Sequence, residues 1–292
     1  MRIIDLHTHG LGGYDTRSTD VTHLLKLAEL HGSWGTSEIV LTVYPATIPV
    51  MRYVLQVIGN AMQTQAESSA TPAENGTLPA RIAGVHLEGP FVNPAKAGAL
   101  NAIAFLNPSI DRFRELAEGF EEIIRTVTVA PELPGALQLI RHIAGLGIRV
   151  NMGHSAAKFT EAEAGFHAGA SGITHLFNAM SGFHHRDPGL AGFGLMNPSV
   201  YVEVIGDPYH LHIETIKLIY SVKPSDRILL ISDTVRDTHA FLKPDAVTDG
   251  YGRLLGGGMT LQEAADRLKQ IGINEEAVIK SVTENPARYL AP

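Results

Sequence analysis

Short apolar runs alternate along this chain with stretches whose apolar residues recur every three to four positions. The short runs predict eight β-strands, over residues 3–9, 38–44, 82–88, 126–129, 148–152, 173–176, 200–205 and 227–232. The longer periodicity predicts helices over residues 21–31, 51–62, 111–124, 136–146, 160–167, 212–221, 261–269 and 275–283. Two segments show neither pattern and are predicted to be loops, the polar residues 63–80 and the glycine-rich residues 181–194.

Eight strands separated mostly by helices predict an α/β fold, and specifically a closed parallel (βα)8 TIM barrel. The alternative is a doubly wound open sheet, which usually carries a glycine-rich phosphate-binding turn after its first strand. The sequence Gly10-Leu11-Gly12-Gly13 follows the first predicted strand and does not match that fingerprint. With 292 residues and 45% hydrophobic content the chain can bury a large core. We expect residues 1–292 to form a single barrel domain.

Composition narrows the setting and the partners. A net charge of −7 and a pI near 6.0 argue against nucleic acid or an anionic membrane as the main partner. No apolar run approaches the roughly 18 residues of a membrane span, and the strand pattern at the N-terminus leaves no room for a signal peptide. The sequence has no cysteine, which excludes disulfides and thiolate zinc sites. We therefore expect a cytoplasmic protein that acts on a small molecule.

Polar residues gather where the predicted strands end. Five of the eight strands end in histidine, glutamate or aspartate, and these candidate site residues are His7, His9, Glu88, His154, His175 and Asp233. Active sites of such barrels lie at the C-terminal ends of the strands. Because strand side chains alternate, His7 and His9 can face the barrel axis together, and His86 shares a face with Glu88.

These residue types point to a bound metal. A carboxylate that directly follows an apolar run, as Glu88 does, needs a cation or hydrogen-bond donors. Imidazole and carboxylate ligands without a thiol suit a divalent ion, for which we expect Zn²⁺ first and Fe²⁺, Mn²⁺ or Co²⁺ as alternatives. One or two ions are expected. A lone strand-end histidine is more often a hydrogen-bonded rim residue, so the prediction depends on the joint occurrence of all six side chains.

Other ionisable residues are given simpler roles. His23, His31, His142 and His167 fall in predicted helices, and we expect them to lie at the surface. Glu132 follows Pro131 at the end of the fourth strand, where a structural role or the support of a metal ligand is expected.

Several motifs together resemble a known family. The most specific are His86-Leu87-Glu88-Gly89-Pro90 and Thr174-His175-x-x-Asn178-Ala179-Met180. Further matching pieces are residues 4–10, 130–132, 153–155, 188–192, 232–233 and 285–288. In this order they resemble the amidohydrolase superfamily, and within it the N-acetylglucosamine-6-phosphate deacetylase family. The resemblance extends from residue 4 to about residue 290.

The resemblance implies roles for individual residues. It implies that Glu88, His154 and His175 hold the principal metal, and that His7 and His9 resemble the pair holding a second metal in some members. Asp233 matches the catalytic aspartate, which is a general base and acid. The positions that match the substrate site are Asn178, Ala179, Arg186 and His210. Arg186 matches an arginine that reaches the phosphate from a neighbouring subunit, and His210 matches the histidine near the substrate carbonyl. A homodimer is therefore expected.

The chain also departs from the family pattern. We expect it to lack the segments that form a small β-sandwich in family members, and we expect another subunit to cover the barrel face that this would expose. Leu100 stands where the family has a histidine, Pro208 replaces a glycine, and Thr234-Val235-Arg236-Asp237 replaces small residues. The segment 236–258 is also shorter. These changes lie around the substrate, so the reaction is better predicted than the substrate.

We therefore expect a metal-dependent amidohydrolase that removes an N-acetyl group from a phosphorylated amino sugar, with a metal-activated water as the nucleophile. One alternative keeps the metal and the barrel but has another N-acyl sugar, a cyclic amide or an N-acyl amino acid as substrate. Another is a barrel that binds a ligand or partner without catalysis. Loss of Glu88, a histidine ligand or Asp233 would indicate such a binding protein, and the sequence retains all of them.

Overall fold

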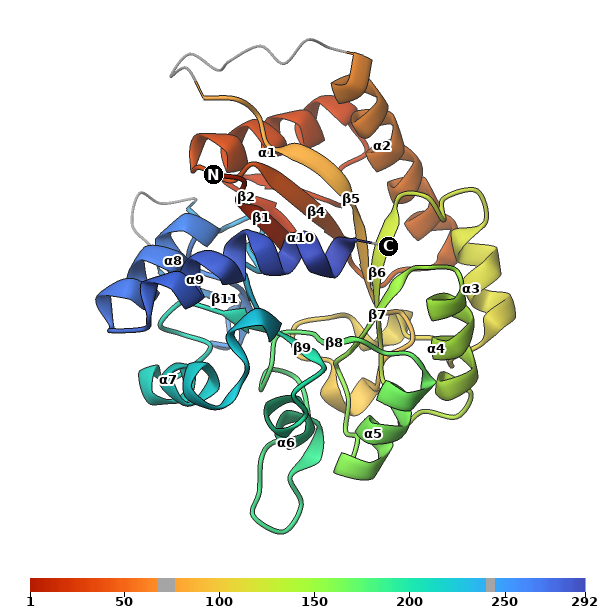
Figure 1. Cartoon of the computed structure of the whole chain (residues 1–292). Coiled ribbons are helices and arrows are strands. Elements are labelled where there is room, and N and C mark those ends of the chain that lie inside the picture. The colour runs from red at the N-terminus through yellow and green to blue at the C-terminus, as the bar shows by residue number, and fades with distance from the viewer. Residues whose placement is uncertain (68–76, 240–244, 292) are drawn as a thin grey trace.

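The barrel predicted from the sequence is present in the computed structural model, which describes residues 1–67, 77–239 and 245–291 (Figure 1). Eight parallel strands form one sheet, in the order β1 (Ile4–Thr8), β4 (Glu38–Val43), β5 (Arg81–Glu88), β6 (Ile124–Val129), β7 (Arg149–Met152), β8 (Gly172–Ile173), β9 (Tyr201–Ile205) and β10 (Ile228–Ile231). The sheet closes where the Asp233 N–H donates to the His7 carbonyl at 2.9 Å. The TIM-barrel prediction is therefore confirmed.

Helices surround this barrel (Figure 1). They are α1 (Val21–Ser33), α2 (Ile48–Glu67), α3 (Ile110–Ala117), α4 (Ala136–Gly145), α5 (Phe159–Ala168), α6 (Gly189–Met196), α7 (Ile213–Val222), α8 (Leu261–Gln270), α9 (Glu275–Val282) and α10 (Glu284–Leu290). The strands are buried on both faces, which explains their nearly continuous apolar character. One layer of apolar side chains fills the space between strands and helices.

The barrel interior differs between its two ends. Ile4, Leu229 and Tyr289 belong to an apolar cluster at the N-terminal ends of the strands, where α10 covers the barrel. At the C-terminal ends the interior is polar, with His7, Glu88 and other ionisable groups buried. The apolar end stabilises the barrel, and the polar end is where we expect chemistry.

Several predicted elements have different bounds in the structure. Helix α2 continues through residues 63–67 of the predicted loop 63–80, of which residues 68–76 lie outside the described part of the chain. The predicted helix 111–124 ends at Ala117, and Ile124 already belongs to β6. Strand β8 ends at Ile173, and the next residues turn away from the sheet.

The glycine-rich segment 181–194 is only partly a loop. Helix α6 starts inside it at Gly189 and buries seven of its eight residues, among them Leu190 and Phe193. A side chain at Gly194 would collide with Leu176, because a Cβ there would lie 2.8 Å from that residue. Here the glycines allow a helix to pack closely on the barrel, so the turn-like composition was misleading.

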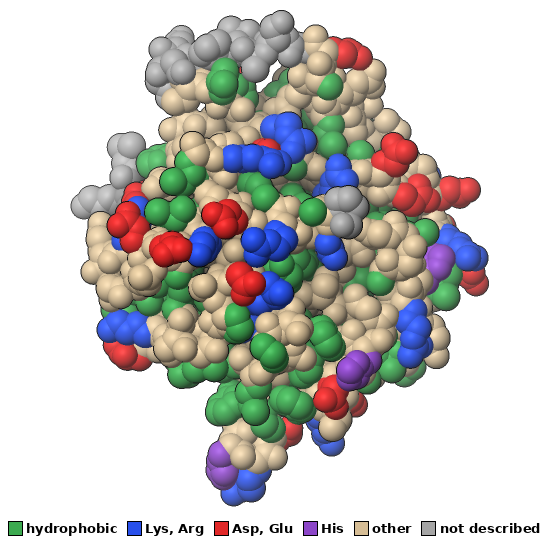
Figure 2. Space-filling model, viewed as in Figure 1, with side chains coloured by type: hydrophobic (Ala, Val, Ile, Leu, Met, Phe, Trp, Pro, Cys, Tyr) green, Lys and Arg blue, Asp and Glu red, His purple; other side chains and the backbone are tan. Residues whose placement is uncertain are grey.

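Smaller elements join the strand ends. Two short hairpins are β2 (Gly10–Leu11) with β3 (Tyr14–Asp15), and β11 (Val247–Thr248) with β12 (Leu254–Gly256). Short 3₁₀ turns are η1 (Pro94–Lys96), η2 (Ala102–Ala104) and η3 (Ser225–Arg227). Among the described residues, no helix is both long and apolar enough to cross a membrane. Figure 2 shows acidic and basic side chains interspersed over the face in view.

Candidate metal and catalytic site

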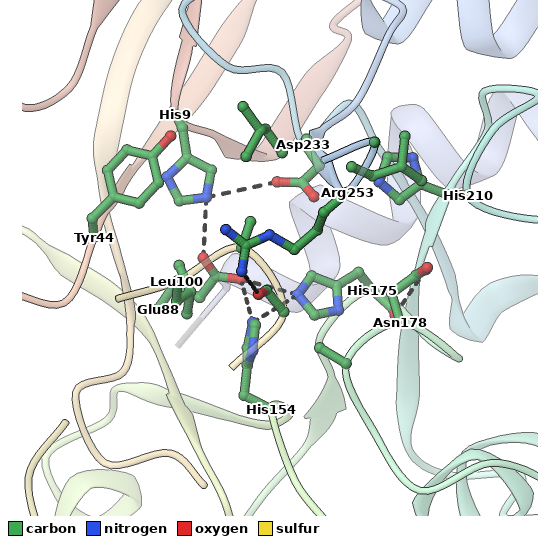
Figure 3. A pocket seen from close by; sticks show the side chains of 17 residues that line it. His9, Tyr44, Glu88, Leu100, His154, His175, Asn178, His210, Asp233 and Arg253 are labelled. Carbon is green, nitrogen blue, oxygen red and sulfur yellow. Dashed lines mark hydrogen bonds and ion pairs between the residues drawn. The ribbon is translucent and has the colours of Figure 1, made fainter. Parts of the chain in front are cut away.

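A cavity of about 380 Å³ opens at the C-terminal ends of the strands (Figure 3). It is lined by five of the six residues predicted at strand ends, which are His9, Glu88, His154, His175 and Asp233. The sixth, His7, is completely buried just beneath it. The structure therefore brings together side chains that are far apart in the chain. Thr8 and Thr234 beside them, whose hydroxyls are hydrogen-bonded, are 226 positions apart.

Glu88 is the centre of this arrangement. Its Oε1 lies 3.0 Å from His154 Nε2 and 3.0 Å from His175 Nε2. The two ring nitrogens are 3.1 Å apart. Three potential ligand atoms thus converge on one small space, in the tight spacing expected of a metal-binding group.

A second group shares the same carboxylate. Its other oxygen, Oε2, lies 3.1 Å from His9 Nε2, and His9 Nε2 lies 3.3 Å from His7 Nε2. Asp233 Oδ1 is 3.3 Å from His7 Nε2. The pairing of β1 with β4 is irregular between Asp5 and Thr8, the stretch that carries His7. Glu88 thus stands between two groups that could each hold an ion.

The hydrogen-bond partners on the far side of two rings indicate which ring nitrogens carry protons. His154 Nδ1 lies 2.9 Å from the Lys96 carbonyl, which can only accept, so this nitrogen is the donor. His7 Nδ1 likewise lies 3.1 Å from a Glu203 carboxylate oxygen. In the neutral rings the lone pairs at Nε2 therefore point into the centre, toward other acceptors such as Glu88. Converging lone pairs repel one another unless a proton or a cation lies between them. The arrangement therefore fits a divalent metal ion.

The charges of the site are consistent with this. Burial raises the pKa of Glu88, but His7 and His154 lower it more, so that the pKa lies well below its usual value. Burial and the Glu88 carboxylate raise the pKa of Asp233 well above its usual range. Burial lowers the pKa of His7 well below its usual value. A carboxylate together with imidazole nitrogens is a donor set for a cation.

The backbone at this end of the barrel adopts an uncommon conformation. His154, His175, Ala179 and Asp233 all have positive φ angles, of 45°, 29°, 49° and 51°. Non-glycine residues rarely adopt this region, at a cost of about 1–3 kcal/mol each. His154, His175 and Asp233 each come two residues after a strand, where the chain turns so that the residue lines the cavity. Extended strands alone would not aim these side chains at one point.

The structure adds a buried glutamate that sequence reasoning missed. Glu203 lies in β9, accepts from His7 Nδ1, and also accepts from Asn151 Nδ2 at 2.7 Å and from the His175 N–H at 3.3 Å. Asn151 in turn accepts from the Tyr289 hydroxyl. A glutamate in the middle of the apolar run 200–205 was the available signal. Glu203 fixes His7 from behind, as carboxylates commonly do for metal-binding histidines.

The opposite wall of the cavity carries the predicted substrate residues. His210, Asn178 and Ala179 line it. His210 Nδ1 lies 2.9 Å from Asp207 Oδ2, so its Nε2 is left for a ligand. Burial raises the pKa of Asp207, but its bonds with His210 dominate and lower it. Asp207 therefore fixes the orientation of this ring, a role that was not predicted.

The predicted phosphate-binding arginine is not brought to the cavity. Arg186 is exposed, lies against the His185 ring, and belongs to the segment before α6, which projects from the molecule (Figure 1). A different arginine, Arg253, lines the cavity and donates to the Gly98 carbonyl at 3.1 Å. Leu100, which replaces the family histidine, also lines the cavity (Figure 3).

One prediction about the remaining histidines is wrong. His31 is completely buried, and its Nε2 lies 3.1 Å from the Thr8 hydroxyl. It sits on the inner face of α1, where its ring fills space against the barrel. His23 and His167 are exposed and His142 is half-buried. Glu132 accepts from the Ser155 hydroxyl and the Ala156 N–H, which is a structural contact beside His154.

The chain is similar to proteins of known activity. No family model matches the chain. It is 30% identical to an N-acetylgalactosamine-6-phosphate deacetylase of Escherichia coli O157:H7, over 98% of this chain and 76% of that protein. It is 35% identical to an N-acetylglucosamine-6-phosphate deacetylase of Bacillus subtilis, over 80% of this chain and 57% of that protein. The chain is thus shorter than both relatives.

Solved structures give the same result. An N-acetyl-D-glucosamine-6-phosphate deacetylase variant of Mycobacterium smegmatis, in complex with N-acetyl-D-glucosamine-6-phosphate, superposes with a TM-score of 0.88 at 25% identity, over 99% of this chain and 77% of that one. The Thermotoga maritima enzyme gives a TM-score of 0.85 at 26% identity, over 99% and 77%. The chain therefore belongs to the N-acetylglucosamine-6-phosphate deacetylase family of hydrolases.

Proposed function

We propose that this protein hydrolyses the N-acetyl group of an N-acetylhexosamine 6-phosphate, releasing acetate and the free amine. The observation that carries the proposal is the convergence of His154 Nε2, His175 Nε2 and Glu88 Oε1 within 3.1 Å of one another. The named activities of the relatives supply the substrate class. We also propose that residues 1–292 act as one catalytic barrel domain.

Glu88, His154 and His175 would hold the principal metal, and His7 and His9 would join Glu88 around a second one. A divalent ion bound there, Zn²⁺ in our proposal, with Fe²⁺, Mn²⁺ or Co²⁺ as alternatives, lowers the pKa of a water and polarises an acyl carbonyl. The Lys96 carbonyl holds the His154 ring through its Nδ1, and the Glu203 carboxylate holds the His7 ring in the same way.

Asp233 is the proposed general base and acid. Its carboxylate lines the cavity beside His7 and His9. It accepts a proton from the attacking water and then delivers it to the amine nitrogen as the C–N bond breaks. A carboxylate beside the proposed metal ligands can hold a proton between these two steps.

The opposite wall binds the sugar. The Nδ1–H of His210 donates to Asp207, which orients the ring, so the doubly protonated imidazolium form is the one that donates through Nε2 to the carbonyl oxygen as negative charge develops on it. Asn178 and Ala179 contact the sugar phosphate. Arg253 lies close enough to contribute a guanidinium from the same chain. Arg186 would contribute only from a neighbouring copy, which is the reason to propose a homodimer.

Two other functions compete with this one. The first is hydrolysis of a different N-acyl compound, and Leu100 in the cavity wall favours it. The second is ligand binding without catalysis, against which the complete set of candidate ligands argues. Hydrolysis rates for acetylated hexosamine phosphates and for N-acyl amino acids separate the first alternative from our proposal.

The experiment is a substitution of the proposed base. Asp233→Asn should lower the rate of acetate release by roughly 10²–10⁴-fold, because the amide cannot take up the proton. Metal content per chain, measured by mass spectrometry, should show that the principal ion remains. Asp237→Asn is the matched control, since Asp237 is exposed and outside the cavity lining. Undiminished activity in Asp233→Asn would mean that the base is another residue, and a wild type without activity on any of these amides would reject the proposed function.

A further inference from the structure

A second cavity, of about 310 Å³, adjoins the metal cavity. The end of β4, helix α2 and the loop between η1 and η2 form its walls. Tyr44, Ala99 and Leu100 line both cavities, so the two meet along this edge. We call this second space the side cavity.

The side cavity lies next to the reacting centre. The Tyr44 ring stacks on the His9 ring, with centroids 4.0 Å apart. Tyr44 and Leu100 lie on the side of His9 and Glu88, whereas Asn178 and His210 lie on the opposite side (Figure 3). The two substituents of an amide carbonyl carbon point away from each other. With the sugar amine on the side of His210, the acyl substituent therefore points toward Tyr44 and Leu100.

The lining of the side cavity is apolar. Val43, Met51 and Val54 are buried there, with exposed fractions of 2%, 0% and 6%. These aliphatic side chains come from the end of β4 and from the inner face of α2.

Three of the four polar side chains in the described lining, those of Thr16, Arg17 and Asn101, make hydrogen bonds within the protein, and the fourth is Tyr44. The Thr16 hydroxyl donates to the Thr42 carbonyl at 2.7 Å, and the Asn101 Oδ1 accepts from the Ile103 N–H at 3.2 Å. The Arg17 guanidinium makes two hydrogen bonds to Asp15, at 2.8 and 2.6 Å, and lies over the Tyr44 ring. A ligand in this space therefore meets mainly hydrocarbon surface, and the one charged side chain in the lining, Arg17, is already paired with Asp15, which suits an alkyl chain and disfavours a charged one.

We propose that the side cavity is an acyl-chain subsite, so that this protein hydrolyses N-acyl hexosamine phosphates whose acyl group is a propanoyl or butanoyl chain as well as acetyl. The inference rests on the proposed function and extends it to a substrate class. The bonds formed and broken are the same as for the acetyl compound. The oxygen of one water bonds to the acyl carbon, the C–N bond breaks, and the amine nitrogen gains a proton as the alkanoate leaves. Leu100 and Tyr44 are the specificity-determining residues at the junction.

The expected signature is a Michaelis constant that falls with chain length. Burying a methylene gains about fourfold in affinity. The tail makes the same contacts in the bound substrate and in the transition state, so KM should fall about fourfold per methylene while kcat stays within about twofold.

The test compares N-acetyl, N-propanoyl, N-butanoyl and N-succinyl glucosamine 6-phosphate as substrates of the wild-type metal-loaded protein. KM should decrease in the first three, and the succinyl compound, which has a carboxylate in place of the terminal methyl of butanoyl, should be at least about tenfold poorer than butanoyl in kcat/KM. If the acetyl compound is hydrolysed but KM rises from acetyl to butanoyl, the acyl-chain subsite is wrong and the proposed function stands. Better turnover of the succinyl compound would overturn the alkyl assignment. Failure to hydrolyse any of the four would reject the proposed function and the subsite with it.

Two variants place the effect in the side cavity. Val54→Phe fills the space from α2, and Ala46→Leu fills it from the half-buried loop after β4, where a larger side chain is more easily accommodated. Both should raise KM for the butanoyl compound by about tenfold or more, because two buried methylenes are lost. Gln56→Phe is the matched control on the exposed face of α2. An unchanged KM profile in a folded Ala46→Leu protein, or the same change in Gln56→Phe, would contradict the proposal.

Discussion

The two halves of the cavity are built differently. The metal half consists of side chains at strand ends, and the substrate half consists largely of side chains on connecting loops. Glu88, in the metal half, has 4% of its side chain exposed, whereas Arg253, in the substrate half, has 57% exposed.

This difference separates reaction from specificity. Moving Glu88 would disturb His9, His154 and His175 at once, because each of them lies within 3.1 Å of its carboxylate. Leu100 and Arg253 can change with little consequence for that cluster. A barrel can therefore retain its chemistry while its loops alter the substrate.

The strongest test of the metal half is Glu88→Gln. Because Glu88 belongs to both candidate metal groups, its loss should empty both, and activity should fall by roughly 10³-fold or more. His9→Asn removes a ligand of one group only, and should leave the principal ion in place. Metal content per chain, measured beside activity, distinguishes the two variants. Equal metal loss in both would mean that the groups act as one site.

Glu203→Gln tests whether the carboxylate bonded to His7 Nδ1 contributes to metal binding. The amide weakens the bond to His7 Nδ1 and should lower metal affinity or activity by roughly 10–100-fold. Tyr289→Phe is the companion variant, since its hydroxyl lies one further step away, on Asn151. Its effect on metal affinity, measured by competition with a chelator, should be smaller. A larger loss in Tyr289→Phe would mean that packing under the barrel, and not the carboxylate, positions His7.

The sequence predicted which side chains meet at these strand ends, and the reason is physical. Each residue of the metal half lies within two positions of the end of an apolar strand, and parallel strands of a closed barrel bring their ends together. No knowledge of side-chain geometry was needed to group Glu88 with His154 and His175. Even so, their convergence depends on positive φ angles at His154 and His175, which no local pattern in the sequence reveals.

Other features were not predicted because they depend on contacts between distant segments. His31 looked like a surface residue in its helix, and only the docking of α1 on β1 buries it. Arg253 reaches the cavity because the hairpin β11–β12 folds back over the strand ends, and Arg186 does not reach it. Loop conformations of this kind leave little trace in hydrophobic periodicity.

His31, which is bonded to Thr8 at the edge of the metal half, offers a test of how stability depends on pH. Burial lowers the pKa of His31 to about 3. Between this value and the unfolded value of about 6.5, only the unfolded chain binds the proton, so the free energy of unfolding decreases as the pH is lowered. The expected loss between neutral pH and about pH 5 is about 2 kcal/mol. His31→Gln should flatten this part of the pH profile in denaturant titrations of metal-free protein. An unchanged slope would show that the ring is protonated in the folded state.

The smallest expected effect concerns the substrate half. Arg253→Gln should raise KM for the phosphorylated substrate by roughly tenfold, since a hydrogen bond to a charged group contributes roughly 1.5–3 kcal/mol. The Arg253 guanidinium also donates to Asp249 and to the Gly98 carbonyl, so some of that gain is offset by bonds lost on binding. The kcat should change little, because Arg253 does not contact the scissile amide in our proposal. Steady-state kinetics with the phosphorylated sugar and its dephosphorylated form measure the effect, which should vanish for the latter.

Arg186→Gln in the same assay decides which arginine binds the phosphate. Arg186 lies on a segment that projects from its own chain, so it can act only on the cavity of another copy (Figure 1). If Arg186→Gln raises KM and Arg253→Gln does not, the substrate half is completed by a second subunit, and the assignment of Arg253 is wrong. Losses in both variants would mean that the two guanidinium groups share the phosphate. In that case mixing the inactive Asp233→Asn protein with Arg186→Gln should restore a low KM in the mixed dimer, because the intact Arg186 of one copy then serves the intact Asp233 of the other.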